Sequence, residues 1–85
     1  MAFVGVHALT GDVLSESSLD AVEAKRAMMR AAHRVVLLAD HSKFRPPSFL
    51  EVARLDGVDD LVTDDAAPPE ALEVACACGV RVHLA

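Results

Sequence analysis

Apolar residues occur in short uninterrupted runs along this chain. One run, Phe3–Val6, begins almost at the first residue, and another, Val35–Ala39, is continuous over its whole length. A short continuous apolar run predicts a strand with both faces covered, as in a parallel sheet. Thr10-Gly11-Asp12 breaks the first run, and residues 15–18 are polar. We therefore expect the first strand to run into Thr10-Gly11-Asp12.

A helix is predicted between these two strands, from about Leu19 to His33. The segment is rich in Ala, Met, Glu, Lys and Arg and contains neither Gly nor Pro, which favours a helix. Ser17 or Ser18 can accept its first free N–H groups. A strand, a helix and a strand of these lengths predict a βαβ unit.

A second unit of the same kind is predicted in the second half of the chain. Val58–Thr63 and Val80–Leu84 are strand candidates, and a helix between them would begin near Pro68-Pro69-Glu70 and be capped by Gly79. Residues 49–55 alternate imperfectly and predict a further short strand. The fold class expected is α/β, with residues 1–85 forming a single domain in which helices flank a mostly parallel sheet.

Polar residues follow the predicted strands at their carboxyl ends, where ligands bind in such sheets. Asp40-His41-Ser42-Lys43 follows the second strand and Asp64-Asp65 the third. An Asp accepts hydrogen bonds from sugar hydroxyls, and a Lys offers a point charge to phosphate. A local ion pair between Asp40 and Lys43 that caps the turn explains the same pattern equally well.

Lys25 interrupts an apolar stripe of the predicted helix. Val22, Lys25, Met29 and Ala32 share one face because residues three and four apart are neighbours on a helix. A lysine in this position either extends along the apolar surface to water, which is the commoner outcome, or points into a site. Glu23 lies on another face and is expected to be solvated.

Composition narrows the class of protein. Of 85 residues 53% are hydrophobic, mean hydropathy is +0.33 and net charge is -5. This is more apolar surface than a small monomer needs, so we expect another chain or another part of a larger protein to cover some of it. The acidic balance, without a Lys or Arg run, argues against strong nucleic-acid binding. No apolar run approaches the roughly 20 residues that cross a bilayer.

The sequence shows no recognisable metal or cofactor motif. The four histidines lack metal-ligand spacing, and no Gly-rich phosphate loop is present. Cys76 and Cys78 cannot chelate one zinc ion from a helix, so we expect them to be buried structural thiols. Two cysteines without a signal peptide predict a reduced, cytoplasmic setting. No catalytic residue, metal site or cofactor is predicted.

Several segments together resemble the sensor domain of DeoR-type transcription regulators. The likeness rests on the order and spacing of Gly5, Thr10-Gly11, Glu23-Ala24-Lys25-Arg26-Ala27-Met28, Leu37-Leu38-Ala39-Asp40-His41-Ser42-Lys43-Phe44 and Leu61-Val62-Thr63-Asp64. It covers nearly the whole chain, up to Val80-Arg81-Val82. The Glu-x-Lys-Arg-x-Met segment followed by Ala-Asp-x-Ser-Lys-Phe is the more specific part.

The resemblance implies a partial domain similar in fold to ribose-5-phosphate isomerase. It implies binding of a phosphorylated sugar or related metabolite, with Lys25, Asp40 and Lys43 near the effector and Glu23 as a further candidate. It also implies that DNA is contacted only through a separate N-terminal winged helix-turn-helix domain. That domain and the first half of the sensor are missing from this sequence, so we expect the chain to be the C-terminal half of a sensor.

Two other functions remain open. The Asp40-His41-Ser42-Lys43 turn is also similar to a turn of ribose-5-phosphate isomerases, which would imply a sugar-phosphate enzyme. Counting back from Asp40 without a gap, Lys25 falls where that family is expected to carry its catalytic Glu, and Glu23 is two residues away. This argues for binding without turnover. The apolar excess also suits a truncated oligomerisation module, and a homo-oligomer is expected.

Overall fold

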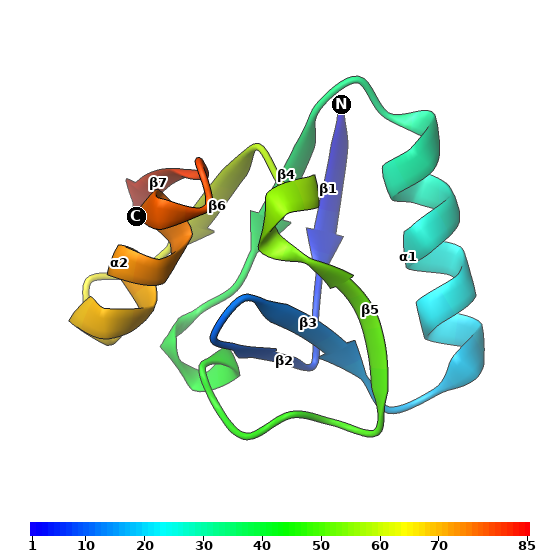
Figure 1. The fold of residues 1–85 in the computed structure, drawn as a ribbon, viewed down its shortest axis with the longest axis horizontal. Helices are drawn as coiled ribbons and strands as arrows, with labels where there is room; N and C mark the ends of the chain where they lie inside the picture. The colour runs from blue at the N-terminus through cyan, green and yellow to red at the C-terminus, as the bar shows by residue number, and fades with distance from the viewer.

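The computed structural model describes all residues, 1–85, and contains two sheets and two helices (Figure 1). A parallel sheet has the strand order β1–β4–β6–β7, and an antiparallel sheet has the order β2–β3–β5. The elements, in chain order, are β1 (Ala2–Gly5), β2 (Ala8–Thr10), β3 (Val13–Glu16), α1 (Leu19–Ala31), β4 (Val35–Leu38), the 3₁₀ turn η1 (His41–Lys43), β5 (Leu50–Arg54), the 3₁₀ turn η2 (Leu55–Gly57), β6 (Asp60–Thr63), α2 (Pro69–Ala77) and β7 (Arg81–Leu84).

The predicted α/β class and both βαβ connections are confirmed. Along the chain, helix α1 comes between the parallel strands β1 and β4, and helix α2 comes between the parallel strands β6 and β7. Helix α1 packs against β1, β3 and β5, whereas α2 packs against β7. In the view of Figure 1, α1 is to the right of the central strands and α2 is to the left.

The first connection contains a hairpin that the sequence did not reveal. Strand β1 ends at Gly5, so the expectation that it runs into Thr10-Gly11-Asp12 is wrong. Thr10 pairs instead with Val13 across the two-residue turn Gly11-Asp12. Gly11 has a φ of 59°, while Asp12 has a negative φ. A glycine alone with positive φ at the first turn position indicates a type II′ turn, which suits the twist of a hairpin.

Strand β3 includes two of the polar residues 15–18, which the sequence did not predict to be in a strand. Ser15 and Glu16 belong to the strand, and both are buried. Ser15 Oγ accepts a hydrogen bond from the Ser48 N–H at 2.9 Å. Glu16 pairs with Lys25. Since these contacts are made by residues distant in sequence, they satisfy the buried polar groups in a way that local polarity could not indicate.

Both helices have the predicted caps. Ser18 Oγ accepts from the Ala21 N–H at 3.2 Å, and α1 ends at Ala31, two residues earlier than expected. Helix α2 begins at Pro69. Its C-terminal end is closed by Gly79, with a φ of 82°, and by the Val80 N–H, which donates to the Ala75 carbonyl. A positive-φ glycine with this bond is the Schellman arrangement.

The two faces of the parallel sheet are buried to different extents. Val4, Leu37, Leu61 and Val82 share a register row, and the first three are almost fully buried in the core. The neighbouring row Gly5, Leu38, Val62 and His83 belongs to the other face, where Leu38 is 44% exposed. Within the Val35–Ala39 run only Leu38 is exposed; Val36, on the same face, is buried, so the expected coverage of both faces is incomplete at Leu38 alone.

Candidate functional site

The carboxyl ends of β4, β6 and β7 surround a hollow of about 310 Å³, here called the strand-end hollow. This is where ligands bind in parallel α/β sheets. Its lining residues come from the two loops that follow β4 and β6 and from the end of the chain: Leu38, Ala39, Asp40, Lys43, Val62, Thr63, Asp64 and Ala85. Two of the four effector-site residues predicted from the sequence, Asp40 and Lys43, are thus together.

Asp40 positions the η1 turn, and Lys43 projects from it. The Asp40 Oδ1 atom accepts the Ser42 N–H at 2.8 Å and also the Ser42 hydroxyl. These bonds from Ser42 are the main reason that the pKa of Asp40 is lowered. Lys43 forms no ion pair. A local Asp40–Lys43 ion pair therefore does not explain the motif, and the ammonium of the half-buried Lys43 residue remains available to an anion.

His41 joins η1 to the end of β6. Its ring Nδ1 lies 2.9 Å from Asp64 Oδ2, and its backbone N–H donates to the same oxygen at 3.1 Å. The side-chain bond raises the pKa of His41 and lowers that of Asp64. Asp64 also accepts the Ala66 N–H. The two loops that line the strand-end hollow are therefore fastened together by one carboxylate.

Thr63 supplies an unsatisfied polar atom in the lining. The residue is 3% exposed, and its hydroxyl is buried without a hydrogen-bond partner. An unpaired buried hydroxyl costs roughly 1–3 kcal/mol, so such groups are rare and call for an explanation. The sequence reading did not select Thr63. The signals were its place in the Leu61-Val62-Thr63-Asp64 segment and its position at the end of a predicted strand.

Lys25 and Glu23, the other two predicted residues, are outside this hollow. The predicted stripe exists: Val22 is buried, and Met29 and Ala32 pack against the core. Lys25 turns from this stripe to a short ion pair with Glu16. Burial acts to raise the pKa of Glu16, but the hydrogen bond and charge of Lys25 outweigh it and leave the pKa lowered. Glu23 is exposed.

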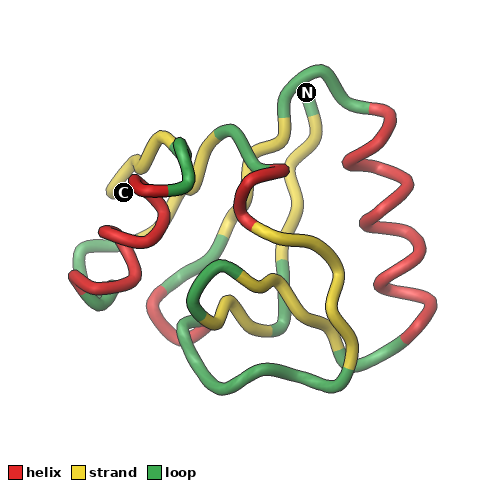
Figure 2. The backbone as a smooth tube through the Cα atoms, in the orientation of Figure 1, coloured by secondary structure: helices red, strands yellow, loops and turns green.

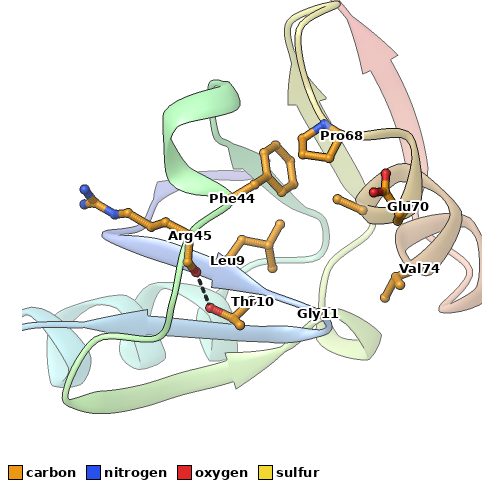
Figure 3. Close-up of a pocket in the computed structure, with 9 residues that line it drawn as sticks. Leu9, Thr10, Gly11, Phe44, Arg45, Pro68, Glu70 and Val74 are labelled. Carbon is orange, nitrogen blue, oxygen red and sulfur yellow. Dashed lines mark hydrogen bonds between the residues drawn. The ribbon is translucent and has the colours of Figure 1, made fainter.

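A second hollow of about 290 Å³ lies between β2, the segment that follows η1 and the first turns of α2 (Figure 3). Its lining includes Leu9, Phe44, Pro68 and Val74. Arg45 donates from Nε to the His7 carbonyl at 2.9 Å, and Figure 3 shows its guanidinium pointing away from the other lining residues. Glu70 is then the charged group nearest the apolar wall. This hollow suits a phosphorylated ligand less well than the strand-end hollow does.

The cysteines and the candidate metal ligands form no site. Both cysteines are free thiols, and Cys76 is exposed, so the prediction of two buried thiols is wrong. No group of three or more His, Cys, Asp or Glu residues is arranged to hold a metal ion. Neither helix is long and apolar enough to span a membrane.

Comparison with known proteins defines the class. A parallel α/β sheet with a hollow beyond its strand ends, lined by apolar residues and a few polar groups, is typical of metabolite-binding domains. Residues 1–65 match the model of the DeoR C terminal sensor domain. The chain therefore belongs to the DeoR C-terminal sensor domain family, and its relatives are transcription regulators.

Three such relatives share a similar level of identity with this chain. The putative aga operon transcriptional repressor of Escherichia coli O157:H7 is 29% identical over 85 residues, which are 99% of this chain and 32% of that protein. The HTH-type transcriptional regulator GlpR of Haloferax volcanii is 32% identical over 96% of this chain and 32% of its own length. The HTH-type transcriptional repressor GlcR of Bacillus subtilis is 35% identical over 74% and 24%. The chain thus spans about a third or less of these relatives.

Proposed function

We propose that this chain is the effector-sensing part of a DeoR-type transcription regulator and that it binds a phosphorylated sugar or a related metabolite without catalysis. Residues 1–85 would then form the C-terminal half of a sensor domain, with DNA contacted through a separate N-terminal domain. The family match supports the regulatory role. The observation that favours a polar ligand is the buried, unpartnered Thr63 hydroxyl in the lining of the strand-end hollow.

The chemistry of the lining suits a phosphorylated, hydroxylated ligand. Lys43 carries a positive charge that no carboxylate of the chain neutralises, and an ammonium is a common phosphate contact. Thr63 can donate to or accept from a sugar hydroxyl. Asp40 keeps an oxygen, Oδ2, that makes no hydrogen bond within the chain. Lys25 and Glu23 stay candidates only if a ligand extends beyond this hollow.

Binding without turnover is favoured over isomerase activity by the carboxylates present. Proton transfer in isomerisation is most efficient with a base whose pKa lies near the operating pH. Asp40 and Asp64 line the hollow, and hydrogen bonds lower the pKa of both below the usual Asp value. Each is therefore a weak base. Lys25, at the position where an isomerase would be expected to carry its Glu, is engaged by Glu16.

Isothermal titration calorimetry can test the proposal on the chain itself. The probes are glucose 6-phosphate and fructose 1-phosphate, with glucose and inorganic phosphate as partial ligands. We expect a sugar phosphate to bind more tightly than either partial ligand. Lys43→Ala should weaken that binding about tenfold or more, since a charge-assisted hydrogen bond contributes roughly 1.5–3 kcal/mol.

The matched control removes an equal charge elsewhere. Arg30 is exposed in the last turn of α1 and makes no ion pair, so Arg30→Ala should leave the affinity unchanged. Equal affinities for wild type and Lys43→Ala would remove Lys43 from the site. If glucose and the sugar phosphates bind with equal affinity, the chain does not recognise the phosphate group, and this part of the proposal is contradicted. Clear isomerase turnover of ribose 5-phosphate would overturn the claim of binding without catalysis.

A further inference from the structure

The two loops that form the strand-end hollow are joined by the contact between His41 and Asp64. Asp64 Oδ2 accepts the His41 backbone N–H at 3.1 Å and lies 2.9 Å from Nδ1 of the His41 ring. Asp64 Oδ1 accepts the Ala66 N–H at 3.0 Å within its own loop. In Figure 2, η1 is the short red turn between β4 and the long green loop that leads to β5. Asp64 therefore fastens this turn to the loop that follows β6.

The η1 turn connects this contact to Lys43. Within the turn, the Lys43 N–H donates to the Asp40 carbonyl at 3.1 Å, and the Phe44 N–H donates to the His41 carbonyl at 3.3 Å. The Asp40 carboxylate caps the same turn through Ser42. Because the turn is short and bonded internally, a movement of His41 relative to Asp64 also moves Lys43.

His41 acts on the hollow only through these neighbours. It is not a lining residue, whereas Asp40, Lys43 and Asp64 are. Hydrogen bonds from Ser42 to Asp40 and from His41 to Asp64 lower the pKa of each carboxyl, so both stay charged in weak acid. The lining therefore has two carboxylates and one ammonium, and a protonated His41 ring supplies the positive charge that balances them.

Other charged groups of the neighbouring segments do not supply this charge. On β7, His83 bonds to Asp60 at 2.9 Å. Asp65 is exposed and outside the lining. Glu70 of α2 and Arg45, which follows η1, line the second hollow. Histidine is also the side chain whose ordinary pKa lies between pH 5 and 8, so His41 is the group at this site that changes its charge in that range.

We propose that His41 is a positioning residue of the effector site, and that the hollow binds an anionic effector more tightly when the His41 ring is protonated. This inference rests on the proposed function, since it assigns a pH dependence to the same hollow. With the ring protonated, the charges of His41 and Lys43 balance those of Asp40 and Asp64. Loss of the proton leaves one uncompensated negative charge beside the bound anion and weakens the contact that places Lys43.

The sign of the effect follows from the contact itself. The bond to Asp64 raises the pKa of His41 above its ordinary value of 6.5. The ring is therefore charged in weak acid and loses its charge as the pH rises through a value above 6.5. Affinity for an anion should fall over the same interval. By reciprocity, a bound anion should raise the pKa of His41 further.

Calorimetry at pH 5.5 and pH 8.5 tests the proposal with two probes. Glucose 6-sulfate keeps one negative charge over this range, whereas glucose 6-phosphate titrates at about pH 6 and is compared between variants at equal pH only. For wild type, the dissociation constant of the sulfate should be about threefold to tenfold higher at pH 8.5, the effect of one partly screened charge. His41→Gln should bind either probe weakly, with little change in the affinity for the sulfate between the two pH values.

His33→Gln is the matched control. His33 is exposed, lines a different hollow and forms no ion pair, so this variant should follow wild type at both pH values. Circular dichroism should show both variants folded. NMR titration of the wild-type His41 ring adds a measurement that needs no variant, because its pKa should rise when the ester is bound.

The outcomes separate this inference from the proposed function. If neither ester binds at either pH, the proposed function is contradicted and this inference is contradicted with it. If an ester binds with the same pH dependence in wild type and His41→Gln, only the role of His41 is contradicted. An ester that binds and leaves the pKa of His41 unchanged would also overturn that role.

Discussion

Thr63 is the residue that most clearly separates a binding site from a polar loop. The loop residues Asp40 and His41 have partners within the two loops: Asp40 accepts from Ser42, and His41 bonds to Asp64. Thr63 instead keeps a hydroxyl buried and unpaired in the lining of the strand-end hollow. A group held at a cost to stability is typical of functional sites.

Replacing Thr63 should therefore stabilise the free protein. Thr63→Val keeps the shape and removes the unpaired hydroxyl, so the free energy of unfolding should rise by about 1 kcal/mol while sugar-phosphate affinity falls. Thr10→Val is the control: its hydroxyl donates to the Arg45 carbonyl, so unfolding should become easier by about 0.5–1 kcal/mol. Urea denaturation measures both. A destabilised Thr63→Val would mean that the hydroxyl is satisfied in solution.

His41 and Asp64 should make the loop contact depend on pH. The folded pKa of His41 lies above 6.5, so its stabilising effect is complete below pH 6.5 and is lost as pH rises through the folded value. The folded pKa of Asp64 lies below 3.8, so its effect is lost as pH falls below about 4. The ion pair is thus strongest between about pH 4 and 6.5.

NMR titration of the His41 ring in wild type and Asp64→Asn tests this contact. The wild-type ring should titrate above 6.5, and the variant ring should titrate lower. The stability difference between the two proteins should be larger at pH 5.5 than at pH 8.5. A His41 pKa that is the same in both would show that the contact does not form in solution.

At the scale of elements, the sequence predicts the apolar strands and the helix caps, but it does not predict the β2–β3 hairpin. Val35–Ala39 and the capping residues Ser18 and Gly79 act locally, so the sequence around them was sufficient. Strand β3 depends on partners far along the chain, and its buried Glu16 looks like a loop residue until Lys25 is placed beside it. The same holds for the site: motif position found Asp40 and Lys43, whereas the burial of Thr63 is a property of the packed sheet.

The Gly79 cap can be tested against a second glycine. Gly79→Ala should lower the free energy of unfolding by about 1–2 kcal/mol, because a residue with a Cβ is disfavoured at a positive φ. Gly57 has no positive φ, and a Cβ there would meet Met29 at an ordinary 3.8 Å. Gly57→Ala should therefore change stability by less than about 0.5 kcal/mol. Thermal unfolding of the two variants measures these changes. Equal losses of stability in Gly79→Ala and Gly57→Ala would contradict the role of Gly79 as a helix cap.

At the scale of the molecule, one face of the parallel sheet forms the core and the other face is partly exposed. The predicted apolar excess appears at two places: the exposed Leu38 of β4 and the hydrophobic hollow lined by Met1, Ala2, Phe3, Met28, Ala31 and Ala32. The strand-end hollow is open as well, so this chain provides only part of the enclosure that a tightly bound metabolite needs. Weak binding by the 85-residue chain is accordingly what we expect.

The central claim, that the strand-end hollow is the effector site, is tested most directly by amide NMR shifts. Addition of a sugar phosphate that binds should move the signals of residues 39–43, 63–65 and 85, and at the same ligand concentration Lys43→Ala should make these shifts much smaller. Shifts confined to residues 9–11 and 70–74, around the second hollow, would contradict the account. So would shifts at the strand-end hollow that are identical in wild type and Lys43→Ala.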